Sequence, residues 1–87
     1  MKTTYNHESL DKHGVTEQEA DEVYATGKDF DMTASDNGND RIMVVGWTAH
    51  GRPLEVGIEY LENGNEHIFH ACEATKHYRQ LFEKDRR

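Results

Sequence analysis

The side chains best suited to chemistry in this chain are one histidine and two arginines. His70 lies in a short apolar stretch near the C-terminal end, Arg41 opens an earlier apolar run, and Arg79 follows in a helical pattern. Histidine is the usual general acid or base near neutral pH, and arginine stabilises charge that develops on a phosphate. The three residues would suit acid–base chemistry at a phosphate group, and they are our candidate catalytic residues.

Each of the three also fits a purely structural role. His70 would be a partly buried strand histidine bonded to the backbone. Arg41 would pair with Asp36 or Asp40 across the preceding turn, and Arg79 would pair with Glu83 one helical turn later. The sequence leaves both interpretations open.

Three more basic residues are candidate RNA contacts: Lys12, His13 and Lys76. Lys12 and His13 also fit the last turn of a helix, where the helix dipole favours cations. The net charge is −7, and residues 1–40 hold three lysines against ten acidic residues. Nucleic-acid affinity comes largely from basic side chains that release counterions, so RNA contacts are expected only near the basic C-terminal helix. The acidic front would attract a basic protein partner.

We expect neither a metal nor a cofactor. His70 and Cys72 share one face of the expected strand, but His67 lies three residues from His70 and should point to the opposite face. A zinc site needs more ligands than this one pair. Cys72 has Glu73 beside it and no adjacent basic residue, which argues against a nucleophilic thiol.

The helices that position these residues have clear start and stop signals. Asn6 is a helix cap, and Gly14 ends that first helix. Thr16 and Glu19 form a capping box for a second helix, which Gly27 ends. A third helix is predicted by apolar residues at helical spacing: Ala74, Tyr78, Leu81 and Phe82.

Four strands are predicted between the second and third helices. Residues 29–34 alternate as an edge strand, residues 41–48 are apolar on both faces, and residues 54–60 alternate most clearly. The last strand covers residues 66–71 and should place His70 on the face of Ile68, opposite Phe69. Turn-forming residues separate the strands at 36–40, 50–51 and 63–65.

The expected fold class is α+β, with two N-terminal helices, a four-stranded antiparallel sheet and a C-terminal helix in a single domain over residues 1–87. All helices should cover one face of the sheet. Five helical residues should pack on it: Val23, Tyr24, Tyr78, Leu81 and Phe82. Leu54, Val56 and Ile58 should supply much of the core-facing side of the sheet.

The single cysteine allows no internal disulfide, and no apolar run follows Lys2 as a signal peptide would require. No stretch is long and apolar enough to span a membrane. A cytoplasmic location is expected.

The order and spacing of several short motifs resemble the BrnT family of small bacterial toxins, a branch of the RelE-like ribonuclease fold. The matching residues are Lys12-His13-Gly14-Val15, Ala20, Val23, Arg41, Gly46, Gly51-Arg52, Ala71, Ala74, Thr75 and Arg79. Two stretches differ from the family. Thr3-Thr4-Tyr5 replaces an acidic-aromatic strand, and Cys72-Glu73 replaces a basic pair.

The resemblance implies an RNA-cleaving toxin that is neutralised by a small antitoxin of the ribbon-helix-helix type. The alternative is a catalytically silent protein-binding module of the same fold, because a fold does not carry an activity with it. Growth arrest on expression would separate the two.

Overall fold

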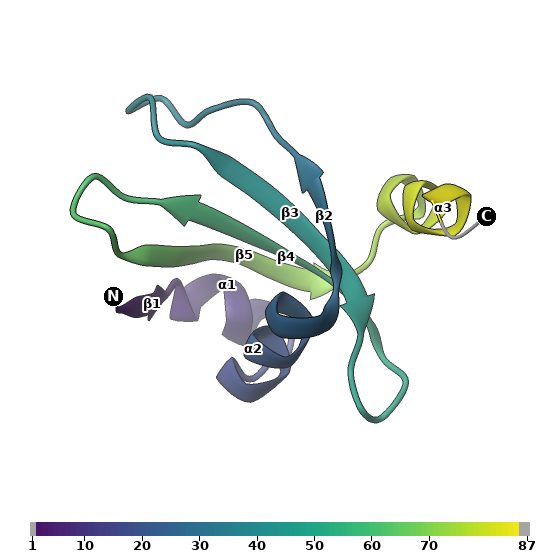
Figure 1. Cartoon of the computed structure of the whole chain (residues 1–87). Coiled ribbons are helices and arrows are strands. Elements are labelled where there is room, and N and C mark those ends of the chain that lie inside the picture. The colour runs from purple at the N-terminus through teal and green to yellow at the C-terminus, as the bar shows by residue number, and fades with distance from the viewer. Residues whose placement is uncertain (1, 86–87) are drawn as a thin grey trace.

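The structure is a computed structural model that describes residues 2–85. Its elements are β1 (Thr3–Tyr5), α1 (His7–Lys12), α2 (Glu17–Thr26), β2 (Lys28–Asp31), β3 (Arg41–Trp47), β4 (Pro53–Tyr60), β5 (Glu66–Glu73) and α3 (Lys76–Asp85). The five strands form one sheet in the order β1-β5-β4-β3-β2 (Figure 1). None of the described helices is long and apolar enough to cross a membrane.

The predicted α+β class is confirmed, but the predicted sheet of four antiparallel strands is wrong. A fifth strand, β1, pairs in parallel with β5, and Thr3 lies opposite Glu66. The amide of Asn6 continues this pairing by donating to the carbonyl of Ile68 at 2.9 Å. With only three residues, β1 is too short to show an alternating pattern, so its neighbour in the sheet decides its conformation.

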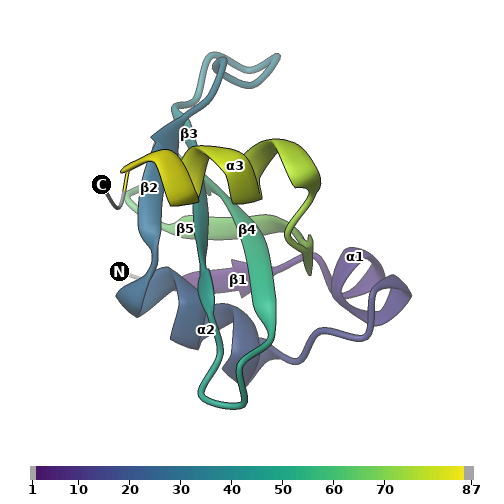
Figure 2. The same ribbon diagram turned by 90° about the vertical axis from the view of Figure 1, so that its right-hand side faces the viewer.

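The helices cover two faces of the sheet, and the prediction of one covered face is therefore wrong. α1 and α2 lie below the sheet in Figure 1, whereas α3 lies apart from them. Figure 2 shows α3 crossing in front of β2, β3 and β4. On that side Phe30, which pairs with Met43, contacts Tyr78 of α3 at 6.1 Å between ring centroids. Tyr78, Leu81 and Phe82 therefore lie on the other side of the sheet from Val23.

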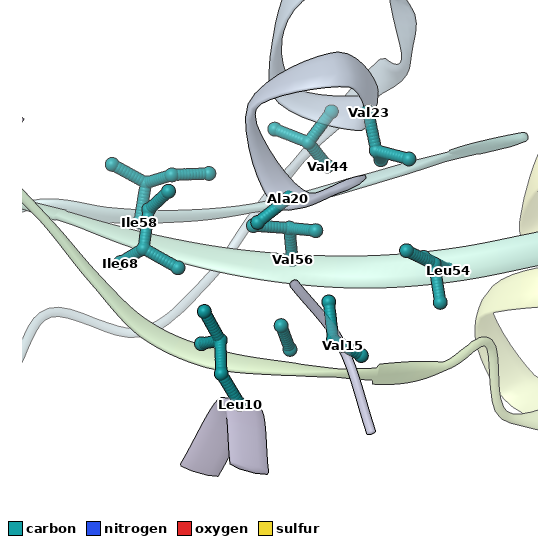
Figure 3. Close-up of a cluster of buried hydrophobic side chains, with 10 residues drawn as sticks. Leu10, Val15, Ala20, Val23, Val44, Leu54, Val56, Ile58 and Ile68 are labelled. Carbon is teal, nitrogen blue, oxygen red and sulfur yellow. The ribbon is translucent and has the colours of Figure 1, made fainter. Parts of the chain in front are cut away.

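The main core lies between the sheet and the two N-terminal helices (Figure 3). Leu54, Val56 and Ile58 of β4 are completely buried in it, which confirms the predicted core-facing side. The remaining buried members are Leu10, Val15, Ala20, Val23, Val44, Ile68 and Ala71, and Tyr5, Tyr24 and Ile42 pack against them. This cluster fixes which side of each strand faces away from α1 and α2.

The predicted helix signals at the N-terminal end are confirmed. The Asn6 side chain accepts a hydrogen bond from the amide of Ser9, and Gly14 has a φ of +63° after α1. The capping box of α2 is complete, because Thr16 accepts from the Glu19 amide and the Glu19 carboxylate accepts from the Thr16 amide. Local sequence alone therefore sets where α1 and α2 begin.

The capping box should make stability depend on pH. The hydrogen bond from the Thr16 amide, together with Arg52 nearby, lowers the pKa of Glu19 despite partial burial. A lowered folded pKa stabilises the protein above the unfolded value near 4.5, and this stabilisation is lost as the pH falls through the folded value. We expect Glu19→Gln to reduce the acid dependence of the urea midpoint and to preserve helix content. An unchanged acid dependence in the variant would contradict the assignment.

Arg52 holds together the turn that contains the Lys12–Val15 motif. Its Nη2 donates to the carbonyl of His13 at 3.0 Å, and its Nη1 donates to the carbonyl of Gly14 at 2.8 Å. The guanidinium also lies 3.5 Å from a Glu73 carboxylate oxygen. Two motifs that are far apart in the sequence, residues 12–15 and 51–52, thus form one contact between the helices and the sheet.

Gly27 ends α2, but its backbone is extended, with φ −80° and ψ −179°. The glycine is required for another reason, which is the close approach of α2 to β3. A Cβ atom on Gly27 would lie 2.7 Å from the Val23 carbonyl oxygen and 2.8 Å from the Val45 carbonyl oxygen. A Cβ on Gly46 would in turn lie 2.9 Å from the Cα of Gly27. The two glycines pack backbone against backbone.

A β-bulge in β5 changes the face that His70 occupies. Gly57 pairs with His70 and the next residue, Ile58, pairs with Ile68, so Phe69 is an extra residue in the ladder. The ring of Phe69 lies over Gly57, on the same side as His70. His70 is therefore opposite Ile68, and the prediction that they share a face is wrong. For the same reason His67 and His70 both face away from α1 and α2, contrary to expectation.

Candidate functional site

Three side chains of β4 and β5 converge on the face of the sheet away from α1 and α2. The Nε2 atom of His70 lies 3.0 Å from Oε2 of Glu55 and 3.3 Å from Sγ of Cys72. Glu55 and Cys72 are direct cross-strand partners, and the bulge at Phe69 brings His70 to the same side. The ladder therefore positions a carboxylate, an imidazole and a thiol around one point.

Glu55 is buried, with 4% of its surface exposed, and each of its carboxylate oxygens has a hydrogen-bond partner. Its second oxygen, Oε1, accepts from the amide of Thr75 at 2.7 Å, just before α3 begins. Burial disfavours the charged carboxylate, but the hydrogen bonds from His70 and Thr75 outweigh this effect, and the pKa of Glu55 lies below its usual value. Glu55 is thus a buried, negatively charged side chain on the face of the sheet away from α1 and α2.

Cys72 is not an activated nucleophile. Burial and then the neighbouring Glu55 carboxylate raise the pKa of its thiol to about 11. A thiol–histidine–carboxylate relay would also use both ring nitrogens of the histidine, one for the thiol and one for the carboxylate. Here Glu55 and Cys72 both contact Nε2, which carries at most one proton. This arrangement does not fit nucleophilic catalysis by the thiol.

Of the three candidate RNA contacts, His13 touches this cluster and Lys76 lies one residue beyond its hydrogen-bond partner Thr75. The ring of His13, at the end of α1, meets the ring of His70 edge-on with centroids 6.2 Å apart. Lys76 is the first residue of α3 and follows Thr75, which binds Glu55. Lys12 is an exposed cation in the last turn of α1, as the dipole argument allows.

The Arg41 guanidinium binds two backbone carbonyls and stacks near an aromatic ring. Its Nε donates to the carbonyl of Thr33 at 2.9 Å, and Nη2 donates to the carbonyl of Ala34 at 3.5 Å. The guanidinium carbon lies 5.4 Å from the ring centroid of Phe69, a cation–π contact. Arg41 therefore connects the loop after β2 to Phe69, the extra residue of the bulge in β5.

Arg79 lies at the other end of β3 from Arg41. It lines a small hollow with Trp47 and Pro53, whereas Arg41 is the first residue of β3. Six residue steps along a strand span about 20 Å. His70 pairs with Gly57, about halfway along β4, so the three candidate catalytic residues share one side of the sheet but do not converge. Their catalytic roles stay predictions.

The buried Glu55 was missed by sequence reasoning. It alternates with Leu54 and Val56 in the clearest strand pattern, so it looked like a solvent-facing residue of a half-buried strand. The available signal was the pairing of this strand with one that carries both His70 and Cys72. The register that aligns these residues depends on the bulge, and no turn-forming residue marks the bulge in the sequence.

Comparison of the chain with protein-family models, with curated proteins and with solved structures finds no match.

Proposed function

We propose that this chain is a protein-binding component of a toxin–antitoxin-like pair and does not cleave RNA. The environment of His70 is the observation that supports the absence of RNA cleavage. A nuclease histidine should face the phosphate that it serves, but Nε2 of His70 faces the buried carboxylate of Glu55. A carboxylate at this point repels the phosphorane that an RNA-cleaving site must stabilise.

The proposal that the chain binds a protein partner rests on the resemblance to BrnT-like toxins and on the charge of the two N-terminal helices. α2 carries four acidic residues and no basic residue, and α1 adds exposed Glu8 and Asp11. Such a surface steers a basic partner toward itself. We infer a small antitoxin of the ribbon-helix-helix type whose basic segment lies across α1 and α2.

A second candidate function is RNA cleavage, and one observation favours it. The basic residues Lys76, Arg79 and Lys84 line one hollow on α3, on the same side of the sheet as His70. If this side binds RNA, Cys72→Arg combined with Glu73→Lys should raise RNA affinity and steepen its salt dependence, since each new cation adds a phosphate contact.

Expression in a bacterial host tests the proposal. We expect the wild-type chain to cause no growth arrest and the purified protein to leave RNA intact. If a short reading frame with a ribbon-helix-helix pattern lies next to this one, its product should bind the chain, and added salt should weaken the complex because salt screens the charges. If the wild-type chain arrests growth, and His70→Ala or Arg79→Ala abolishes the arrest with the fold intact, the proposal of a catalytically silent module is contradicted. The chain would then be an RNA-cleaving enzyme.

Charge reversal on the helices locates the interface. Glu8→Lys with Asp11→Lys should weaken the complex by about tenfold or more, since rim charges control association. The matched control is Asp36→Lys with Glu62→Lys, which makes the same change in net charge on two exposed turns beyond the helices. Equal weakening by both double variants would show that only net charge matters and would contradict an interface on α1 and α2.

A further inference from the structure

We propose that Glu55, His70 and Cys72 form a zinc-binding site on the open side of the sheet. Each residue offers one ligand atom, and the three atoms lie within 4.8 Å of one another. A carboxylate oxygen, an imidazole nitrogen and a thiol sulfur are all established ligands of Zn²⁺. This inference is independent of the toxin–antitoxin proposal.

The separations of the Glu55 and Cys72 ligand atoms from His70 Nε2 are close to what zinc requires, and the third pair lies within 4.8 Å. With metal–ligand bonds of 2.0–2.3 Å at tetrahedral angles, neighbouring ligand atoms are separated by about 3.4–3.6 Å. The observed separations from His70 Nε2 are 3.0 Å to Glu55 and 3.3 Å to Cys72. A small outward movement of the side chains therefore makes room for the ion.

The convergence of a carboxylate oxygen and a sulfur on one nitrogen is the arrangement that a shared cation would use. A hydrogen bond between His70 and Glu55 would account for those two residues alone. The Cys72 thiol donates to the Glu73 carbonyl at 3.3 Å, and its sulfur also lies 3.3 Å from the same nitrogen, so all three ligand atoms face one point. A cation placed between the three atoms satisfies all of them at once.

The site is held in place by the surrounding structure. The Thr75 amide binds Oε1 of Glu55 and so fixes the carboxylate with Oε2 directed at His70. Such partners behind the ligands commonly change metal affinity by 10- to 100-fold when they are removed. The His70 side chain is 31% exposed, so solvent can reach the cluster and supply the fourth ligand.

The donor set favours zinc over the hard cations Ca²⁺ and Mg²⁺. Ca²⁺ takes six to eight oxygen ligands and Mg²⁺ an octahedron of oxygens, which one carboxylate does not provide. Mixed sulfur and nitrogen ligands suit zinc. On binding, the Cys72 thiol releases its proton to solvent as the zinc–sulfur bond forms, and its 3.3 Å contact with the Glu73 carbonyl is given up. The Nε2 proton that His70 donates to Glu55 also leaves for solvent, and the neutral ring keeps its proton on Nδ1.

Cobalt and zinc titrations of the purified, metal-stripped chain test the site. We expect one equivalent of Co²⁺ to bind with thiolate-to-cobalt charge-transfer absorption in the near ultraviolet, and Zn²⁺ to displace it. Zinc should also raise the melting temperature, because a ligand that binds only the native state stabilises it. Cys72→Ser should abolish the charge-transfer absorption and lower zinc affinity on the order of a hundredfold.

Control variants separate this site from the other histidines. His50→Ala, on an exposed turn, should keep wild-type affinity, whereas His70→Ala and Glu55→Gln should lose it with circular dichroism unchanged. If Glu55→Gln fails to fold, Cys72→Ser decides, since Cys72 is only partly buried. Cobalt binding without thiolate absorption, or wild-type zinc affinity in Cys72→Ser, would show metal held by surface histidines and would overturn the proposal.

Discussion

Val56→Asp is expected to unfold the protein. Val56 is completely buried in the middle of β4, between the sheet and α2, and it lies opposite Val44 and Ala71 in the ladders. An unpaired carboxylate at this point has no partner among the apolar side chains of the core, and such a charge costs several kcal/mol. A chain of this size is stabilised by a margin of about 4–13 kcal/mol, so the loss is of the same order. Far-ultraviolet circular dichroism and urea titration measure the result.

Val56→Ala and Val56→Thr separate the effect of charge from the effect of volume. Val56→Ala removes two methyl groups and should cost about 2 kcal/mol, with a cooperative transition retained. Val56→Thr keeps the shape and adds one buried hydroxyl, so it should lie between the other two variants. A native, wild-type-like Val56→Asp protein would show that the core does not lie on this side of β4.

Gly27→Ala should cause the second large loss of stability. The added methyl group would lie 2.7 Å from the Val23 carbonyl oxygen, 2.7 Å from a Val44 methyl and 2.8 Å from the Val45 carbonyl oxygen. Two of these neighbours are backbone atoms in α2 and β3, so no side-chain rotation relieves the clash. Overpacking of this kind costs 1–3 kcal/mol or more, and here we expect about 3 kcal/mol in the free energy of unfolding.

Gly38→Ala is the matched control for this substitution. Gly38 has a φ of +82°, and a Cβ there would meet nothing within 4 Å. The same methyl group should therefore cost only the backbone strain of an alanine in the left-handed region, about 1–2 kcal/mol. If Gly27→Ala proves no more destabilising than Gly38→Ala, the close packing of α2 on β3 is not as the structure describes it.

The parts of the fold that could be predicted from sequence are those with a local cause. Asn6, Thr16 and Glu19 determine helix starts through bonds to amides within three residues, so nothing distant is needed to identify them. Leu54, Val56 and Ile58 identify the core side of β4 because strand alternation is fixed by the pleat. These predictions held because local geometry and the final packing agree.

The parts that could not be predicted depend on distant partners. β1 is a strand because β5 offers it an edge, and the sheet edge that accepts Thr3–Tyr5 is more than 60 residues away in the chain. The bulge at Phe69 adds one residue to a ladder and reverses the expected faces of His67 and His70. The bulge therefore misled the prediction of the faces at the candidate site, and it concealed the link between His70 and Glu55.

Because α3 lies outside the main core, it should unfold locally more easily than the part of the sheet under α1 and α2. The core under α1 and α2 contains every fully buried large side chain among the described residues, whereas Tyr78, Leu81 and Phe82 of α3 are only partly buried. The helix can therefore lift from the sheet while that core stays closed, as a separate unit of local unfolding. Its lifting would take the Thr75 amide from Glu55 and expose Val45, so the charge state of the sheet face and the attachment of the C-terminal helix are coupled.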